Sequence, residues 1–216
     1  MTELSKIAQN YYTDKGVTYY NSHCYTEIYD SYFKELKNEN RKVYILEIGI
    51  QSGYDLLMIN DYFEGNCEIY GIDINLNNLE IELPNNIHVF EFDAANLKNL
   101  TDFYKKFQTW SIIKLPQFDI IIDDGSHNSI DILTSLSFFY NKLSKNGIYI
   151  IEDLHANTAK DALYYLTFNE NKCNVQMDNV TNKIKSNIIY YNYDSYCNDF
   201  KCSICAILRF NNTKHI

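Results

Sequence analysis

From residue 43 onward, short apolar runs rich in β-branched residues alternate with longer stretches whose apolar residues recur every three or four positions. The short runs have the composition of buried strands, and the longer stretches have the periodicity of amphipathic helices. Strands that alternate with helices predict a parallel sheet covered by helices on both faces. The seven expected strands cover residues 43–50, 68–74, 87–93, 118–124, 147–153, 186–191 and 203–210.

Apolar stripes mark three of the expected helices. One lies within residues 97–107, one within 133–143, and one within 28–36 after Thr26, its expected N-cap. Such stripes normally face a hydrophobic core, so we assign them no cofactor role. In a chain of 216 residues we expect one compact unit, with residues 1–42 as an N-terminal helical lid or cap and residues 43–216 as the sheet domain.

Three strand ends carry residues suited to a nucleotide. The first strand ends in EIGIQSG, so Gly49 and Gly53 stand where the backbone must turn tightly and approach a ligand closely. The second ends in GIDI, which places Asp73 about 20 residues further on, where a carboxylate can accept both ribose hydroxyls. The third ends at Asp93, which could accept a hydrogen bond from an adenine amino group. These features fit a nicotinamide dinucleotide or S-adenosylmethionine, but the third glycine of G-x-G-x-x-G is missing.

The fourth and fifth expected strands both end in acidic residues. FDIIIDDGSH contains Asp123, Asp124 and His127, and GIYIIEDLH contains Glu152 and Asp153. Parallel neighbours bring their carboxyl ends to one crevice, where three carboxylates would repel each other unless a proton or cation lies between them. Oxygen ligands favour Mg²⁺ or Mn²⁺, and a histidine that titrates near neutral pH can take a proton.

Several of these residues also have purely structural interpretations. Asp123 is favoured as a residue that accepts backbone N–H groups of the loop or the next helix. His127 could simply bond the backbone of its turn. His155, which follows the second acidic motif, could hold a neighbouring group or line the pocket. The turn Asp14–Gly16 could be no more than an anchor for the N-terminal segment.

Together, these motifs resemble the class I S-adenosylmethionine-dependent methyltransferases, in particular the metal-dependent macrolide-sugar O-methyltransferases, some relatives of which are labelled cephalosporin hydroxylases. The similarity runs through TDKG, HCYTEIY, LEIGI, YGIDI, IIDDGSH and GIYIIEDLH, over residues 13–155. It implies a Rossmann-like α/β fold whose seven-stranded, mostly parallel sheet has the order 3-2-1-4-5-7-6, the last strand antiparallel, with helices on both faces.

The resemblance also implies a site. It places the cofactor over a set of strand-end residues, namely Glu47, Gly49, Gly53, Asp73 and Asp93. We count Asp123 among the candidate cofactor contacts as well. The N-terminal segment is expected to fold over cofactor and acceptor and to exclude water, with Lys15 and Tyr25 as candidates for contact.

The implied reaction is O-methylation of a sugar hydroxyl in a glycan, a nucleotide sugar or a natural product. Asp124, Glu152 and Asp153 are the expected ligands of Mg²⁺ or Mn²⁺, and His127 with Asp124 would carry the catalysis. Two alternatives stay open: a non-catalytic S-adenosylmethionine-binding scaffold of a biosynthetic complex, and a nicotinamide-dependent oxidoreductase.

Net charge and composition limit the class of molecule that the chain is expected to bind. A formal net charge of −9 without a basic stripe argues against nucleic acid, which leaves a small-molecule or glycan acceptor as the expected partner. The polar start MTELSKIAQN and the lack of a long apolar run predict a cytoplasmic chain without a membrane span. Six cysteines then indicate reduced thiols, with zinc at Cys197, Cys202 and Cys205 as a minor alternative. The sequence leaves a homo-oligomer open.

Overall fold

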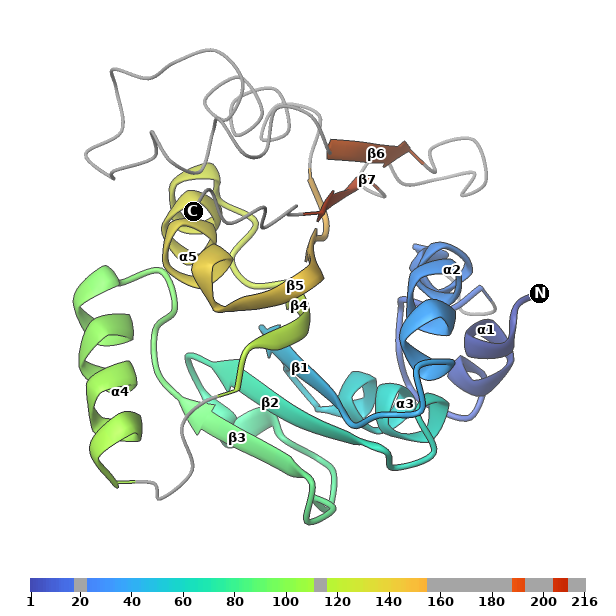
Figure 1. The fold of residues 1–216 in the computed structure, drawn as a ribbon, viewed down its shortest axis with the longest axis horizontal. Coiled ribbons are helices and arrows are strands. Elements are labelled where there is room, and N and C mark those ends of the chain that lie inside the picture. Colours follow the sequence, from blue (N-terminus) through green and yellow to red (C-terminus); the bar gives the residue numbers. More distant parts are fainter. Residues whose placement is uncertain (18–22, 111–115, 155–187, 193–203, 210–216) are drawn as a thin grey trace.

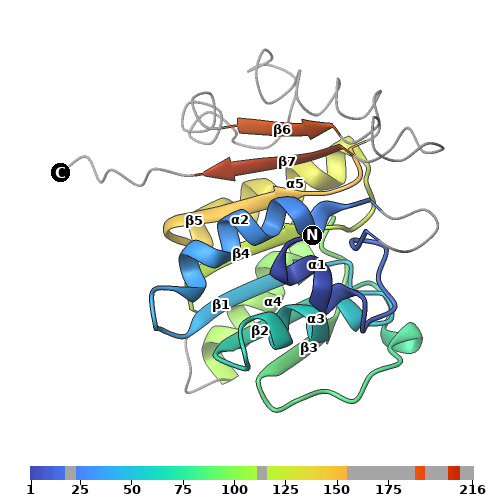
Figure 2. The same ribbon diagram turned by 90° about the vertical axis from the view of Figure 1, so that its right-hand side faces the viewer.

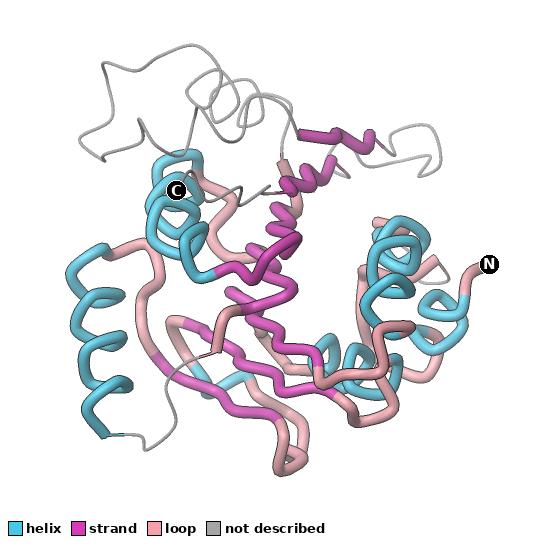
Figure 3. Tube along the Cα trace, in the orientation of Figure 1, coloured by secondary structure: helices cyan, strands magenta, loops and turns pink. Residues whose placement is uncertain are grey.

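The central feature is a single sheet with helices on both faces. The structure, a computed structural model, describes residues 1–17, 23–110, 116–154, 188–192 and 204–209. Seven strands form the sheet in the order β3-β2-β1-β4-β5-β7-β6. Helices α1, α2 and α3 lie on one side of it and α4 and α5 on the other (Figure 1), so strands form the centre and helices the two outer layers (Figure 3). The expected α/β fold class is confirmed.

The strand bounds lie within two residues of the expected ones, except that β5 begins four residues early, at Leu143, which the sequence pattern assigned to the preceding helix. They are β1 (Val43–Ile48), β2 (Cys67–Asp73), β3 (Ile87–Glu91), β4 (Phe118–Asp123), β5 (Leu143–Ile151), β6 (Ile188–Asn192) and β7 (Ile204–Arg209). Pairing is parallel between β3, β2, β1, β4 and β5, whereas β7 runs antiparallel to both β5 and β6. The strand order and the antiparallel last strand agree with the resemblance.

The helices are α1 (Glu3–Ala8), α2 (Tyr25–Lys37), α3 (Tyr54–Tyr62), α4 (Leu97–Trp110) and α5 (Ser129–Phe139), with 3₁₀ turns η1 (Leu76–Asn78) and η2 (Tyr140–Lys142). The expectation that Thr26 caps α2 is wrong. Helix α2 begins at Tyr25, and its N-cap is Cys24, two residues earlier than expected and in a left-handed conformation. The buried Thr26 hydroxyl instead lies 2.8 Å from the Ser5 hydroxyl of α1.

Two hydrophobic cores flank the sheet. One gathers the inner faces of α2, α3, β1 and β2 and includes Leu4 and Ala8 of α1. The other joins the opposite face of the sheet to α5 and to Leu100 of α4. Figure 2 shows α1, α2 and α3 together in front of the sheet. The N-terminal segment therefore shares a core with the strands, although the boundary at residue 42 stays a prediction.

Some expectations fall on residues that the structure does not describe. His155, Cys197 and Cys202 lie outside the described ranges, and the side chain of Cys205 in β7 is likewise undescribed. Among the described helices, each is too short or too polar to span a bilayer.

Candidate active site

The site is built on the carboxyl ends of four neighbouring strands. Ile48 at the end of β1 is in register with Ile72 of β2 and with Asp123 of β4, which in turn is in register with Ile151 of β5. Beyond the strands the backbone stays paired, because Asp124 N donates to Ile48 O at 2.9 Å and Glu152 N donates to Asp123 O at 3.0 Å. The two acidic motifs are thus adjacent, as their place on neighbouring parallel strands predicted.

Gly49 makes this convergence possible. Its φ is +83°, and a Cβ atom there would lie 2.1 Å from the carbonyl oxygen of Asp124. Gly53, also at φ +83°, caps the start of α3. Because the left-handed region costs other residues free energy and the Asp124 backbone leaves no room, position 49 requires glycine. The expected tight turn is present at both glycines.

Two pockets open at this edge of the sheet. Pocket A has a volume of about 260 Å³ and is lined by residues that include Gly49, Asp73, Asp93 and Asp123. Pocket B, of about 290 Å³, is lined by residues that include Tyr12, Asp55, Asp124, His127 and Asp153. Gly49, Gln51 and Asp124 belong to both linings, so the two pockets meet at the ends of β1 and β4.

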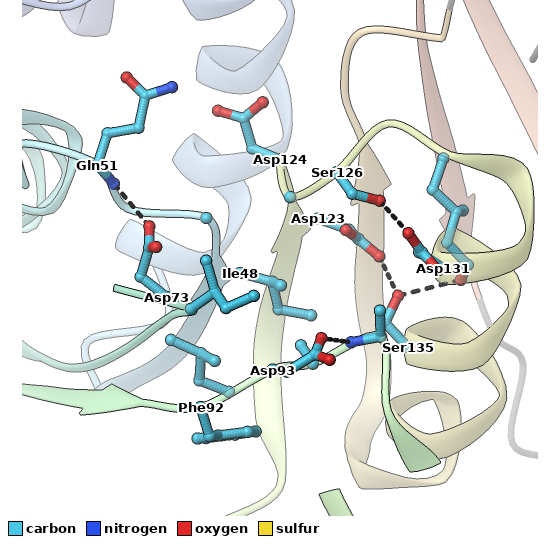
Figure 4. Close-up of a pocket in the computed structure, with 17 residues that line it drawn as sticks. Ile48, Gln51, Asp73, Phe92, Asp93, Asp123, Asp124, Ser126, Asp131 and Ser135 are labelled. Atoms are coloured by element: carbon cyan, nitrogen blue, oxygen red, sulfur yellow. Dashed lines mark hydrogen bonds between the residues drawn. The ribbon is translucent and has the colours of Figure 1, made fainter. Parts of the chain in front are cut away.

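Asp73 and Asp93 line pocket A at positions fixed by backbone hydrogen bonds. Asp73 Oδ2 accepts from the N–H groups of Ile50 and Gln51 at 2.9 and 3.0 Å. Asp93 Oδ1 accepts from Ala95 N at 2.9 Å. Figure 4 shows both carboxylates at the pocket wall beside Phe92 and Ile48. Each carboxylate keeps further acceptor capacity, which suits the hydroxyls and amino group of an adenosine.

Asp123 is bonded within the fold, by two side-chain hydroxyls in addition to the backbone of Gly125, where the sequence predicted backbone N–H donors alone. Its Oδ2 accepts hydrogen bonds from the hydroxyls of Ser135 and Tyr149, the latter at 2.8 Å. Burial raises the pKa of the Asp123 carboxyl, although these hydrogen bonds act against the rise. The side chain still lies in the wall of pocket A, where it points towards α5 while Asp124 points away from it (Figure 4).

Asp124, His127 and Asp153 form one candidate metal group. One ligand atom from each lies within 4.8 Å of the others, and all three line pocket B. His127 and Asp153 have φ values of +56° and +48°, a conformation that costs free energy and is common at functional sites. Two carboxylates and an imidazole suit a divalent cation such as Mn²⁺, and the carboxylates also suit Mg²⁺. We call this set the outer group.

Glu152, the third expected metal ligand, faces a different partner. Its Oε2 accepts from Lys15 Nζ at 2.7 Å and its Oε1 accepts from the Tyr29 hydroxyl. Lys15 Nζ also lies 2.5 Å from Asp124 Oδ2. The side chains of Lys15 and Glu152 are almost completely buried, and neither residue lines pocket A or B. The roles expected for them, cofactor contact and metal ligation, stay predictions.

Burial dominates the protonation of this cluster. It raises the pKa of Asp124 to about 6 and that of Glu152 well above the ordinary value, while Lys15 acts in the opposite direction on both. Burial by itself would lower the pKa of Lys15, but the surrounding carboxylates more than offset this and raise it. The raised pKa favours the ammonium form of Lys15.

Glu47 is buried and belongs to neither pocket lining. Its carboxylate is buried, and neither oxygen has a hydrogen-bond partner among the described residues. The nearest cation, Lys15 Nζ, is 3.7 Å from Oε1, and burial raises the pKa of Glu47. A buried carboxylate without hydrogen-bond partners is costly, and the raised pKa lowers that cost because it favours the neutral form.

Tyr25 donates to Asp153 Oδ1 at 2.7 Å, and its expected contact with the cofactor stays a prediction. Burial, followed by the charge of Asp153, raises the pKa of Tyr25. Sequence reasoning missed Tyr29 and Asp55, which also reach the cluster. Tyr29 carried a signal, since it lies four residues after Tyr25 and therefore on the same face of the helix. Asp55 carried no such signal.

Comparison with protein-family models gives no match. Among curated proteins, the demethylmacrocin O-methyltransferase of Streptomyces fradiae is 31% identical over 160 residues, 70% of this chain and 36% of that protein. The 8-demethyl-8-alpha-L-rhamnosyl tetracenomycin-C 2'-O-methyltransferase of Streptomyces olivaceus is 29% identical over 163 residues, 71% of this chain and 38% of that protein. The chain thus matches under two fifths of the length of these curated relatives.

Solved structures agree on the fold. MycE methyltransferase from the mycinamycin pathway, in complex with Mg, SAH and mycinamycin VI, aligns with a TM-score of 0.64 at 22% identity, over 99% of this chain and 56% of that chain. Human methyltransferase-like protein 13 with SAH aligns with a TM-score of 0.55 at 13% identity, over 84% and 78%. The resemblance is confirmed at the level of fold and of named relatives: the chain shares the fold of these methyltransferases, and the curated proteins that it matches are named as O-methyltransferases.

Proposed function

We propose that the chain is an S-adenosylmethionine-dependent, divalent-metal-dependent O-methyltransferase that acts on a sugar hydroxyl. The observation that carries the proposal is the meeting of pockets A and B at Asp124. Pocket A offers the carboxylates suited to adenosine, and pocket B offers the outer group suited to a cation. A methyl donor in pocket A and an acceptor in pocket B would therefore meet where the two pockets adjoin, beside Asp124.

The chemistry assigns separate roles to the residues. S-adenosylmethionine supplies a sulfonium methyl group, and a bound divalent cation lowers the pKa of a hydroxyl that would otherwise hold its proton about as tightly as water does. Asp73 and Asp93 would hold adenosine, and Asp124 with Asp153 would hold the cation. His127 Nε2, 4.0 Å from Asp124 Oδ1, faces the same pocket and would accept the hydroxyl proton.

The curated relatives support a sugar acceptor. They are named for O-methylation of sugar-bearing small molecules such as a rhamnosyl tetracenomycin, which favours a natural-product sugar over a polysaccharide. The net charge of −9 supports an acceptor other than nucleic acid.

Transfer of a radiolabelled methyl group tests the reaction. S-adenosylmethionine labelled in its methyl group would be incubated with Mg²⁺ and with rhamnosides and nucleotide sugars. We expect label in a glycoside, loss of transfer in EDTA, and at least a hundredfold lower rate for His127→Ala, because general-base catalysis contributes about 10²–10⁴-fold. Transfer that is unchanged in EDTA would remove the metal from the proposal.

A further inference from the structure

Tyr12 is an exposed aromatic residue at the mouth of pocket B. Its surface is 73% exposed, and among the side chains that the structure describes it is the only aromatic one that lies mainly in solvent. It lines pocket B together with polar residues such as Gln51 and Ser52. Ligand pockets typically combine aromatic surface with a few polar groups, so the ring of Tyr12 is a candidate for contact with whatever enters pocket B.

The two neighbours of Tyr12 in the chain fix its position. The Tyr11 hydroxyl donates to Asp61 and the Thr13 hydroxyl donates to Asp55, so both neighbours are bonded to helix α3. Tyr11 also packs against the hydrophobic core, and Thr13 is buried. Because the residues on either side are turned towards the protein, Tyr12 is held with its side chain in solvent. A backbone that is already fixed loses less conformational entropy when a ligand binds to it.

Tyr54, the first residue of α3, supports the ring of Tyr12. The centroids of the two rings are 6.4 Å apart and their planes are inclined by 70°, an edge-to-face arrangement. Edge-to-face contacts of this kind are favourable and orient the rings. Tyr54 is itself placed by Gly53, the N-cap of α3. The contact leaves most of the surface of Tyr12 exposed, so the ring is oriented without being covered.

A sugar ring has surfaces that match the two sides of pocket B. Its hydroxyl groups lie around the rim, whereas the C–H bonds of the ring form an apolar patch on one face. These hydrogens carry partial positive charge because the neighbouring oxygens withdraw electrons, and the face of a tyrosine ring is negative. A sugar whose C–H face lies on Tyr12 could direct hydroxyl groups to Gln51 and Ser52, which line the same pocket.

We propose that Tyr12 is an acceptor-binding residue whose ring stacks against the C–H face of the acceptor sugar at the mouth of pocket B, with Tyr54 as its support. The stacked ring would set the orientation of the sugar, and with it the hydroxyl that reaches the outer group. The inference deepens the proposed function and rests on it. The stacking itself requires neither the metal nor the methyl donor.

Saturation-transfer NMR tests the contact without any turnover. Methyl α-L-rhamnopyranoside is added to the full chain with S-adenosylhomocysteine and Mg²⁺, and the aromatic protons of the protein are saturated. We expect transfer to the C–H protons on one face of the sugar in the wild type and in Tyr12→Phe, which keeps the ring. In Tyr12→Ala the transfer should be at least about fivefold weaker, because the stacking surface is lost.

Steady-state kinetics separates binding of the acceptor from binding of the cofactor. With the glycoside that is methylated fastest, Tyr12→Ala should raise KM for the glycoside at least about fivefold. Its KM for S-adenosylmethionine and its affinity for S-adenosylhomocysteine should stay within about twofold of the wild type, because Tyr12 does not line pocket A. Leu83→Ala, the control, removes an exposed apolar residue outside both pocket linings and should behave as the wild type.

The outcomes distinguish this inference from the proposed function. Wild-type saturation transfer and wild-type KM for the glycoside in Tyr12→Ala would overturn the stacking role, and methyl transfer by the same variant would leave the proposed function standing. An equal loss of S-adenosylhomocysteine binding in Tyr12→Ala would also overturn it, because Tyr12 would then serve the cofactor or the fold. Saturation transfer that depends on Tyr12, in a chain that methylates no glycoside, would keep the sugar contact and remove the proposed reaction.

Discussion

At the residue scale, the site depends on a few positions with little freedom. Gly49 must accept both a left-handed backbone and the carbonyl oxygen of Asp124 at close range. Asp124 contacts Lys15 through Oδ2, and its side chain also lines pocket B. The side chains of the neighbouring residues Asp123 and Asp124 point in opposite directions and have different partners (Figure 4). One of two consecutive aspartates can therefore be structural while the other belongs to the site.

Gly49→Ala should destabilise the chain more than Gly65→Ala. Gly65 also has a positive φ, +74°, but an added Cβ there meets nothing within 4 Å. Gly65→Ala should therefore cost only the conformational term of about 1–2 kcal/mol, and Gly49→Ala should add the clash with Asp124. Urea unfolding of the two variants measures the difference, and equal losses would show that the turn at position 49 relaxes freely.

Asp124 should make stability depend on pH. Its pKa is about 6 in the folded chain against an ordinary 3.8, so between these values the folded chain holds a proton that the unfolded chain has lost. The stability from this proton is fully present below pH about 4 and is lost as pH rises through about 6. Unfolding free energies from pH 3.5 to 7 should fall more steeply in the wild type than in Asp124→Asn. Parallel curves would contradict the raised pKa.

At the element scale, the site residues at the strand ends could be predicted from the sequence. The residues that pack against them from other elements could not. Parallel strands bring their carboxyl ends to one edge, so Asp73, Asp93, Asp124 and Asp153 could be placed from sequence alone. Lys15 reaches the same edge only because its turn is bonded to α2, and no periodicity encodes that packing. The same holds for the N-cap of α2, where Thr26 satisfies a partner in α1.

At the amino end of β4, away from the pockets, the ion pair of Arg41 and Asp119 should contribute to stability and not to the site. Asp119 of β4 accepts from Arg41 through both oxygens at 2.7 and 2.9 Å, from Tyr44 N at 3.0 Å and from the Ser144 hydroxyl at 2.6 Å. Asp119→Ala should lose about 3 kcal/mol and Ser144→Ala about 1 kcal/mol of unfolding free energy. Chemical denaturation checks both, and Mn²⁺ binding should persist. Similar losses in the two variants would contradict the account.

At the scale of the whole molecule, the N-terminal segment joins the site to the core. Leu4, Ala8 and Tyr25 are buried in the hydrophobic cluster that includes β1 and α3, while Lys15 and Tyr25 bond the acidic residues. A helical segment ahead of the sheet was predictable from its apolar stripe. Its depth in the core was not, because burial at α1 depends on contacts with residues far along the chain.

Removal of residues 1–24 should therefore damage the fold and not merely open a pocket. The truncation exposes apolar surface under α1, with each buried leucine-sized side chain contributing about 1.5–3 kcal/mol, and it leaves Asp124 and Glu152 without the ammonium of Lys15. We expect the melting temperature to fall by more than about 10 °C, measured by circular dichroism. An unchanged melting temperature would show that the segment is a detachable lid.

Pocket A should hold the adenosyl part of S-adenosylmethionine. Isothermal titration calorimetry with S-adenosylhomocysteine tests this, with NAD as the competing ligand and Asp73→Ala as the variant. We predict one S-adenosylhomocysteine per chain, at least tenfold weaker binding in Asp73→Ala because the carboxylate facing the ribose is lost (about 1.4 kcal/mol per factor of ten), and no binding of NAD. Binding of NAD without binding of S-adenosylhomocysteine would contradict the account.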